Sequence, residues 1–547
     1  APMTRDTDLD PVSVPCARRP TEKEPEHVSC APEPYVSPLA WDAADNSLFR
    51  PLSKIFEVDP PREAPNVNAF DEVPDSAWFT NRIGVRRIPA DELVRGACQV
   101  EDMLDPDAAG DGEYVIDQGK PNGASPGFRV KIGGKRKYMF KTDFAKEPER
   151  PSAAAAIGTA VYHAVGFNTS CEQVLFVEPK TFKLMPGLKF TANDGVTRAF
   201  DEKALQRVFG EAVKRGERYR FQASAWLGGY LIGPFKYEGT RSDDPNDIIP
   251  HENRRDLRGA RLLAAWLHHF DAREQNSMDS WFAVDRSRPE SSPGWVKHYY
   301  LDTSDCLGSE WDWDGISRRM GDSYLLDFAD IGADFVTLGL IERPWERKKR
   351  TPGMEMFGYF HWDEFDPERW RNEYPNPAFD RATEHDNAWM ARILSRFDRE
   401  DVKALVGLGR FQNPEASEFL TEVLEQRLRK ILERYLTRLS PISHLRVDGS
   451  NRLCGLDLAR RRALRPESTF RYAATMKSAR GASALSVETG QGGDLCMTLP
   501  HVTTEGGSSY VVVTVQNGVA TGSLEAHLYD LGPGRGYTLV GLTRPDP

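Results

Sequence analysis

"HHFDAREQN", residues 268–276, is the stretch on which the interpretation of this 547-residue chain depends. Apolar residues in the segment before it recur at spacings of three and four, which predicts a helix that ends there: Leu257, Ala260, Leu263, Ala264 and Leu267. The stretch itself holds His269, then Asp271 two positions later, then Asn276 five positions after that. Packing does not require polar residues in this order, so the stretch is a candidate functional loop.

Upstream of this loop the sequence predicts a small unit of mixed strand and helix. "GFRVKIGGKRKYMFKTDF" (127–144) alternates in polarity around Gly133 and Gly134, which indicates a β-hairpin. "PSAAAAIGTAVYHAVG" (151–166) predicts an alanine-rich helix with Ser152 as its cap and Gly166 as its end. A strand at 175–177 completes an α+β unit.

Other polar residues fall where a phosphate-transferring loop needs partners. His269, Asp271 and Asn276 match the H-x-D-x-x-x-x-N spacing of protein kinases, in which the aspartate accepts a hydroxyl proton and the asparagine binds magnesium. Asp302 follows "YYL" in "KHYYLDTSDCLGS" (297–309), where a second magnesium ligand is expected. Lys141 ends the second strand of the predicted hairpin, where a lysine contacts the α- and β-phosphates of ATP.

A glycine-containing segment before the hairpin is the candidate phosphate loop. "GKPNGASPG" (119–127) supplies Gly123 and Gly127, whose backbone amides are suited to cradle phosphate. The sequence therefore predicts ATP and Mg²⁺ as cofactors, with Asp271 and His269 as catalytic-loop residues and Asn276 and Asp302 as metal ligands.

With these motifs in place, residues from about 119 to 440 resemble the atypical protein-kinase-like fold of the HipA and CotH type. They look most like exported bacterial members that carry a "DEVPDSAWFTNR" segment and a "DDPND…HENRR" loop. The resemblance implies a two-lobed domain that transfers a phosphoryl group to a hydroxyl acceptor. Two positions depart from the kinase pattern. "AAAAIG" lacks the helix glutamate, and Asp302-Thr303-Ser304 replaces Asp-Phe-Gly. Lys141 is therefore expected to pair with Asp302, Glu147 or Glu149, or to stay mobile.

The predicted fold class is α+β, with a kinase-like domain followed by an all-β sandwich. Residues 1–67 form an extended amino-terminal arm laid over a later domain. Twelve of the 38 prolines fall in its first 65 residues, which predicts no regular helix there. The kinase-like domain spans 68–445, with a small mixed lobe to about 195 and a helical lobe from about 196. Its clearest helix, at 413–439, is capped by Asn413. Alternating strands at 510–516, 524–530 and 537–542 indicate a sandwich over 446–547.

The net charge, the apolar runs and the cysteines indicate which partners and which compartment to expect. The 71 basic and 82 acidic residues give a net charge of −11 without a basic tract, which argues against nucleic acid as the partner. No apolar run approaches the length of about 18 residues that a transmembrane helix needs. Seven cysteines without a C-x-x-C motif predict two disulfides, Cys16 with Cys30 and Cys454 with Cys496, and hence export. The alternative is that all seven are reduced and buried.

Two other functions stay open at this stage. One is a pseudokinase scaffold of cell-surface assembly, with a protein or a surface polymer as its partner. The other is a carbohydrate- or surface-binding protein that works through the sandwich and exposed tryptophans.

Asp243, Asp244, Asn246 and Asp247 are candidate calcium ligands, but turn and capping roles are favoured because the spacing is not that of an EF-hand. The tryptophans of "SEWDWDG" (309–315) are expected in the core. The sequence does not indicate an oligomeric state.

Overall fold

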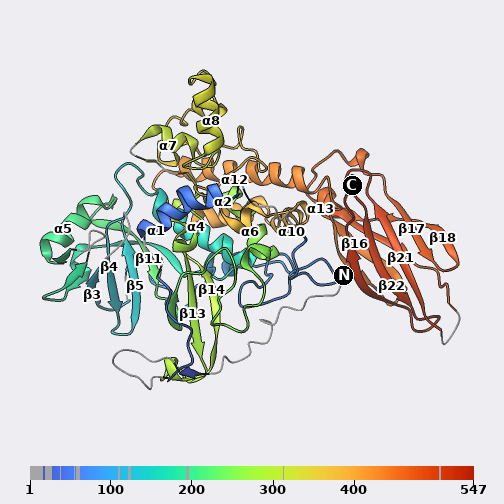
Figure 1. Ribbon diagram of the computed structural model, residues 1–547, viewed down its shortest axis with the longest axis horizontal. Helices are drawn as coiled ribbons and strands as arrows, with labels where there is room; N and C mark the ends of the chain where they lie inside the picture. Colours follow the sequence, from blue (N-terminus) through green and yellow to red (C-terminus); the bar gives the residue numbers. More distant parts are fainter. Residues whose placement is uncertain are drawn as a thin grey trace.

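A computed structural model of the chain contains a mixed sheet, a body of helices and a β-rich carboxyl-terminal region (Figure 1). It describes residues 16–18, 28–36, 39–54, 56, 62–108, 111–120, 125–191, 196–308, 310–311, 313–503 and 507–547. Within these ranges, no helix is long and apolar enough to cross a membrane.

The predicted hairpin is present at the centre of a seven-stranded sheet. Strands β4 (Gly127–Ile132) and β5 (Arg136–Lys141) pair antiparallel, and the turn residues Gly133 and Gly134 have φ of 58° and 74°. Strand β11 (Arg218–Ala225) pairs with β5 on one edge and with β6 (Glu172–Val177) on its other edge. The mixed sheet therefore extends beyond residue 195, the predicted limit. The other strands are β3 (Tyr114–Gly119), β7 (Phe182–Leu184) and β10 (Lys214–Arg215).

The alanine-rich helix α4 (Arg150–Val165) packs against this sheet and starts earlier than predicted. Its N-cap is Glu149, and Ser152 lies inside the first turn, so the prediction of Ser152 as cap was wrong. Asp143, from the segment before the helix, accepts a hydrogen bond from the Ser152 amide at 2.7 Å instead. The helix ends at Gly166, as predicted, where φ is 152° and a Cβ would lie 2.3 Å from the Phe79 ring.

The helical body surrounds the segment that contains the candidate loop. Helix α12 confirms the predicted long helix, and Asn413 caps it by accepting the Glu415 amide at 3.0 Å. The prediction of a helical region missed a three-stranded antiparallel sheet, whose first strand precedes α6 and whose other two strands follow the candidate loop. The helices are α6 (Arg255–Leu267), α10 (Glu384–Leu394), α11 (Arg399–Gly407) and α12 (Pro414–Tyr435), and the strands are β12 (Tyr230–Gly233), β13 (Ser277–Ala283) and β14 (Gly294–Tyr300).

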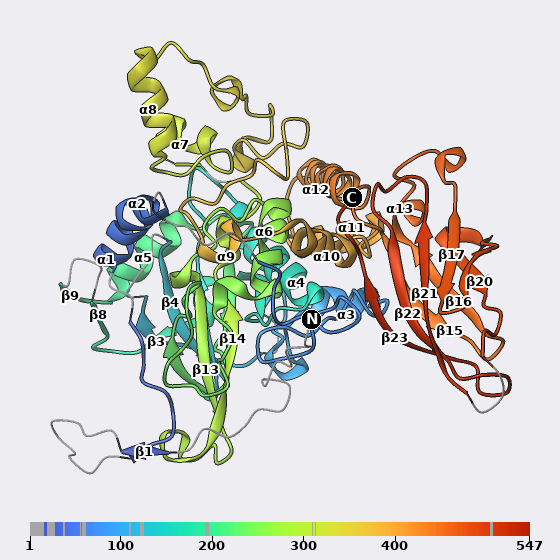
Figure 2. The ribbon, with the colours of Figure 1, turned by 45° about the vertical axis from the view of Figure 1, so that its right-hand side comes forward.

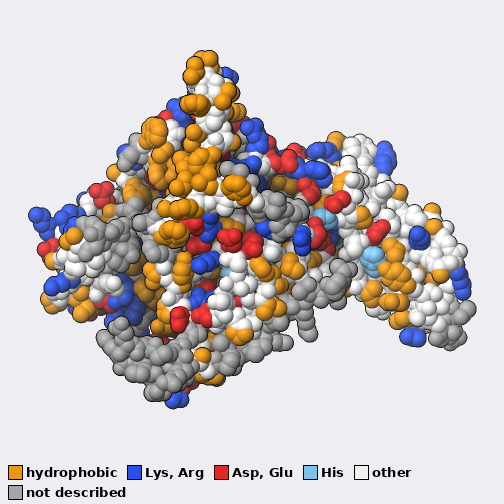
Figure 3. All heavy atoms as spheres, viewed as in Figure 1, with side chains coloured by type: hydrophobic (Ala, Val, Ile, Leu, Met, Phe, Trp, Pro, Cys, Tyr) orange, Lys and Arg blue, Asp and Glu red, His pale blue; other side chains and the backbone are white. Residues whose placement is uncertain are grey.

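Two short helices after the candidate loop project from the helical body (Figure 2). They are α7 (Asp314–Arg319) and α8 (Phe328–Thr337). Hydrophobic side chains gather on the projecting α8 (Figure 3), where Phe335 and Val336 are 84% and 81% exposed.

Described residues of the amino-terminal arm contact the sheet of β12, β13 and β14. The Tyr35 amide donates to the Ile232 carbonyl of β12 at 2.8 Å, and Cys30 is buried against β13 and β14. The prediction that the arm holds no regular helix was wrong, because residues 39–54 form α1 (Leu39–Ala44), a π-helical turn η2 (Asp45–Phe49) and α2 (Arg50–Lys54). Pro51 is the one proline of this stretch, and it lies in the turn that follows the π-helical turn.

The carboxyl-terminal region is a β-sandwich of two antiparallel sheets. Their facing side chains form one hydrophobic core, which includes Leu453, Met497, Val513 and Leu528. It begins at Ile442, slightly before the predicted boundary. One sheet holds β15 (Ile442–Val447), β16 (Arg452–Asp457), β20 (Asp494–Thr498) and β19 (Glu488–Thr489), and the other holds β18 (Gly481–Leu485), β17 (Ala473–Ser478), β21 (Ser509–Gln516), β22 (Leu524–Asp530) and β23 (Tyr537–Thr543).

Three disulfides are present. Both predicted pairs have formed, and Cys454 and Cys496 face each other on the neighbouring strands β16 and β20. The third pair, Cys98–Cys171, was not predicted, and Cys306 is a buried free thiol. The alternative of seven reduced cysteines is therefore wrong.

Candidate active site

The structure brings Lys141 and Asp302 together although 161 positions separate them in the sequence. Lys141 is the last residue of β5, and its Nζ lies 3.0 Å from Oδ2 of Asp302, which follows β14. The pairing confirms one of the partners expected for Lys141. Asp302 has a φ of 48°, a left-handed conformation that turns the chain from β14 into the 3₁₀ turn η8 (Thr303–Asp305). Its side chain stays 37% exposed, so the pair is open on one side.

The charges of this pair hold each other in the ionised state. Burial by itself lowers the pKa of Lys141, but the carboxylates of Asp302 and Glu172 raise it above its usual value. Burial likewise raises the pKa of Asp302, but Lys141, Ser304 and Lys120 together hold that pKa well below its usual range. The site therefore presents an ammonium beside a carboxylate at neutral pH.

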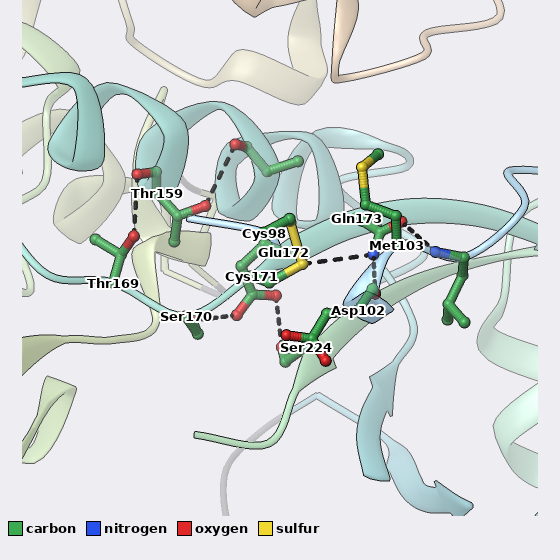
Figure 4. Close-up of a disulfide and its surroundings, with 12 residues drawn as sticks. Cys98, Asp102, Met103, Thr159, Thr169, Ser170, Cys171, Glu172, Gln173 and Ser224 are labelled. Carbon is green, nitrogen blue, oxygen red and sulfur yellow. Dashed lines mark hydrogen bonds between the residues drawn. A yellow bond between two sulfur atoms is a disulfide. The ribbon is translucent and has the colours of Figure 1, made fainter. Parts of the chain in front are cut away.

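Glu172 is a half-buried carboxylate near Lys141 that the sequence did not point out. It starts β6, where it accepts hydrogen bonds from Ser170 at 2.7 Å and from Ser224 (Figure 4), and from Gln222 at 3.0 Å. The preceding residue is Cys171, whose disulfide to Cys98 fixes the start of the strand (Figure 4). Burial raises the pKa of Glu172, and Ser224 and Lys141 oppose that rise. No motif spacing marks Glu172, because its relation to Lys141 arises across β11.

The missing helix glutamate has a packing explanation. Helix α4 lies directly on η8, and the Thr303 hydroxyl donates to the Ala155 carbonyl at 3.1 Å. A Cβ on Gly158 would lie 2.7 Å from the Thr303 side chain, so even alanine there is too large for the observed packing. The small residues of "AAAAIG" thus allow the segment that carries Asp302 to approach the helix closely.

Arg150, at the start of α4, fixes the same segment from its other side. Its guanidinium donates to the carbonyls of Ser304 at 2.7 Å and Cys306 at 3.0 Å, and pairs with Glu147 at 2.5 Å. Glu149 faces Arg220 at 3.8 Å. Neither Glu147 nor Glu149 is the partner of Lys141.

The candidate loop begins where α6 ends. His268 closes the helix in a left-handed conformation, with φ of 58°. His269 is fully buried, its Nδ1 lies 2.9 Å from the Tyr162 hydroxyl, and burial lowers its pKa to about 4. A neutral buried histidine of this kind braces the loop and does not itself exchange protons at neutral pH.

Asp271 is held by its own loop. The Asn276 side-chain amide donates to Oδ2 of Asp271 at 2.8 Å and to its backbone carbonyl at 2.7 Å. Arg273 pairs with Oδ1 at 2.7 Å. Asp271 and Asn276 are therefore adjacent, as the spacing of the loop predicts.

Burial raises the pKa of Asp271 to about 8, because Arg273 offsets the lost hydration only in part and the Glu373 carboxyl shares a hydrogen bond with it. The nearby Asp305 carboxyl has its pKa raised to about 7 by burial and by the charges of Asp271 and Asp302. The Leu301 amide donates to the Asn276 carbonyl at 2.9 Å, so the residue before Asp302 is bound to the loop that carries Asp271. Glu373 and Asp305 belong to no motif and were not predicted.

The predicted phosphate loop contains Gly123 and Gly127, and Lys120 lies in the same segment. Gly123 lies outside the described residues. A Cβ on Gly127 would lie 2.2 Å from the Phe140 carbonyl, so strand packing already requires glycine there. Lys120 is a second ammonium beside the pair; burial, with Lys141 near it, lowers its pKa to about 8. Its Nζ donates to the Ser125 carbonyl at 2.6 Å.

The amino-terminal helical segment borders the candidate loop. Asp42 of α1 lies 3.8 Å from Arg273, the partner of Asp271, and Arg50 of α2 donates to Glu274 at 3.1 Å. The approach to Asp271 is therefore lined by the arm on this side.

Asp302 and Asn276 are the candidate ligands for a magnesium ion. Within the described ranges, no group of three or more His, Cys, Asp and Glu side chains is arranged to hold a metal ion. Mg²⁺ needs only one or two protein carboxylates when nucleotide phosphates supply further oxygens. Asp302 supplies one part-exposed carboxylate, and the Asn276 side-chain nitrogen donates to Asp271, which leaves the Asn276 amide oxygen as its candidate ligand atom.

The other candidate ligands have structural roles. Asp244 accepts the Asn246 amide at 3.0 Å, and Asp247 binds His251 at 2.8 Å and the Arg241 amide, as expected for a turn. Trp311 and Trp313 are 39% and 71% exposed, so their expected place in the core was wrong.

Comparisons with protein-family models, with curated proteins and with solved structures found no match for this chain. The function is therefore argued from the site alone.

Proposed function

We propose that the protein is an exported, kinase-like phosphotransferase that binds ATP and Mg²⁺ between its mixed sheet and its helical body. The observation that supports this is the Lys141–Asp302 pair at 3.0 Å, because it joins a phosphate-binding cation to a metal-binding carboxylate from distant parts of the chain. In this proposal the two parts are the lobes of a HipA- or CotH-like fold.

Each residue has one task in the proposed reaction. Lys141 holds the α- and β-phosphates, and Asp302 and Asn276 hold the metal ion, which neutralises phosphate charge when bound. The oxygen of the acceptor hydroxyl forms a bond to the γ-phosphorus while the bond from that phosphorus to the bridging oxygen of ADP breaks. Asp271 takes the hydroxyl proton. The acceptor is a hydroxyl of a protein or of a surface polymer.

Thermal unfolding with Mg-ATP tests nucleotide binding. A ligand of the native state raises the melting temperature in proportion to the logarithm of its concentration once it exceeds Kd. We expect such a rise up to millimolar Mg-ATP, and its loss in Lys141→Met and in Asp302→Asn. Lys137→Met is the matched control, because Lys137 lies on the same strand with an exposed side chain. No shift in the wild type would refute the proposal.

The second candidate is a pseudokinase scaffold, and the state of Asp271 favours it. With a pKa of about 8, Asp271 is mostly protonated at pH 7, and Arg273 and Asn276 already engage it. An exported protein also meets little ATP. A melting shift with Mg-ATP but no ADP release and no transfer from γ-labelled ATP would identify the scaffold.

Three disulfides support the proposed export, because such bonds persist in oxidising compartments and are rare in the cytosol. Thiol labelling of the denatured, unreduced protein from its native cells should detect Cys306 alone. Seven reactive thiols would exclude an oxidising compartment.

A further inference from the structure

A polar cavity of about 290 Å³ lies at the carboxyl end of α4. It is enclosed by the last turn of α4, by α3 (Ala90–Arg95) and by the segment that carries Arg82. The polar residues that line it include Arg82, Glu92, Arg95 and His163. Thr303 contacts α4 two turns earlier, at Ala155, so about 12 Å of helix separates this cavity from the segment that carries Asp302.

Two guanidinium groups face the cavity without a carboxylate bound to them. Nη1 of Arg82 donates to the carbonyls of His163 at 2.8 Å and Phe167 at 3.2 Å, and burial lowers the pKa of Arg82 to about 10. Neither Arg82 nor Arg95 forms an ion pair in the part of the chain that the structure describes. The rest of the Arg82 guanidinium and the whole of that of Arg95 therefore have hydrogen-bond donors to offer.

His163 adds an unsatisfied polar atom to the same wall. Its Nδ1 is buried and has no hydrogen-bond partner within the described ranges. Burial, with the charges of Arg82, Lys297 and Arg95 around it, lowers the pKa of His163 to about 3, so the ring is neutral and free to donate through Nδ1. Buried polar atoms are normally paired, so an unpaired one at a cavity wall favours a ligand there.

Positive charge exceeds negative charge around this cavity. The charges of Arg82, Arg95 and Lys297 act on His163 against that of Glu92, and Asp75 acts on Arg82. Glu92 is already bound by both terminal nitrogens of Arg86, one of them at 3.0 Å. Lys297 has no ion pair in the described part of the chain, and burial beside Arg82 lowers its pKa.

We infer that this cavity binds the phosphate group of a small phosphate monoester, through Arg82, Arg95 and His163, with Lys297 contributing charge. Guanidinium groups match tetrahedral oxyanions in geometry and charge. The volume is near the lower limit for small-molecule pockets, which leaves space for a compact organic group beside the phosphate. The site is independent of the proposed nucleotide site.

Calorimetric titration at constant ionic strength tests the inference, with glycerol 3-phosphate as the monoester, inorganic phosphate as the free anion and chloride as the non-specific control. We expect saturable binding of glycerol 3-phosphate, tighter than that of phosphate, and none of chloride. Arg95→Gln should weaken it about tenfold or more, and Lys297→Gln several-fold. Arg82 is left intact because it also holds two backbone carbonyls.

Two control variants separate this site from other cationic surfaces. Arg207→Gln removes an exposed charge from α5 (Glu202–Glu211) and should not change binding. Lys141→Met should also leave binding unchanged. Loss of binding in Lys141→Met with retention in Arg95→Gln would place the phosphate at the nucleotide site and overturn the inference. Equal affinity for inorganic phosphate and for glycerol 3-phosphate would show that the cavity does not bind an organic group beside the phosphate. The absence of saturable binding would overturn the whole inference.

Discussion

Two buried aspartates of this molecule, Asp71 and Asp271, have the same chemistry and opposite surroundings. Their exposed fractions are 9% and 8%, so loss of hydration does not distinguish them. Asp71 contacts three guanidinium groups, those of Arg392 at 3.0 Å, Arg544 at 2.6 Å and Arg255. Asp271 has one, Arg273, and shares a hydrogen bond with the carboxyl of Glu373.

The pKa values diverge accordingly. Burial raises both, but at Asp71 the three arginines more than offset it and hold the pKa well below its usual range. At Asp271 the single arginine does not, and the pKa rises to about 8. Asp71 thus joins α6, α10 and the segment after β23, and is structural. The incompletely paired carboxylate is the one whose protonation can change near neutral pH, which is a property of functional sites.

Replacing each aspartate with asparagine tests this contrast. The loss of stability at Asp71 is the largest effect that we expect. Asp71→Asn leaves three arginines around a neutral side chain, and we expect a loss of about 3–5 kcal/mol in the free energy of unfolding. Asn tolerates the left-handed backbone of residue 71, where φ is 58°, so the loss reports charge and not strain. Asp271→Asn at pH 7 should cost less than about 1 kcal/mol, because Asn resembles the protonated acid.

Urea unfolding of both variants at pH 7 measures these values. Equal losses in the two variants would contradict the distinction between a structural and a functional carboxylate.

Two glycine-to-alanine substitutions sharpen the description of the site. Gly158→Ala places a methyl group against Thr303, and we expect about 1–3 kcal/mol of destabilisation with weaker Mg-ATP binding, because the segment that carries Asp302 must shift. Gly210→Ala, in α5, meets no atom within 4 Å and should stabilise the protein by about 0.5–1 kcal/mol. Thermal melts with and without Mg-ATP measure both effects. Unchanged stability in Gly158→Ala would show that the helix does not need a small residue there.

The smallest expected effect is a pH dependence of stability. Because the pKa of Asp271 is about 8 in the folded protein and about 3.9 when unfolded, the folded protein binds more protons between these values. Stability contributed by Asp271 is therefore complete below about pH 4 and is lost as the pH rises towards 8. In metal-free buffer, the wild type should lose about 1 kcal/mol more than Asp271→Asn between pH 7 and 8.5. Parallel pH profiles would contradict the raised pKa.

Elements that local patterns encode were predictable from the sequence. The hairpin around Gly133 and Gly134, the end of α4 at Gly166 and the Asn413 cap of α12 depend on residues a few positions apart. The sandwich strands and two disulfides were predictable for the same reason, since period-two alternation and cysteine pairing in a strand-rich segment need no knowledge of distant packing.

For the side chains of the candidate site, the sequence likewise predicted some placements and left others open. Spacing within one loop placed Asp271 beside Asn276, and the order of strands suggested Lys141 and Asp302. The sequence left open which acid pairs with Lys141, because Asp302, Glu147 and Glu149 were equal candidates before their partners were known.

Tertiary structure alone decided the rest. Glu172 reaches the neighbourhood of Lys141 across β11, and Glu373 meets Asp271 from a segment about a hundred residues later in the chain, so no local signal marks either one. The hydrogen bond from the Ser152 amide of α4 to Asp143 and the helix at 39–54 were missed because packing partners outweighed local preferences. The physical reason is that hydrogen bonds and periodicity act between sequence neighbours, whereas the charge balance of a buried site is set by whichever distant side chains the fold brings together.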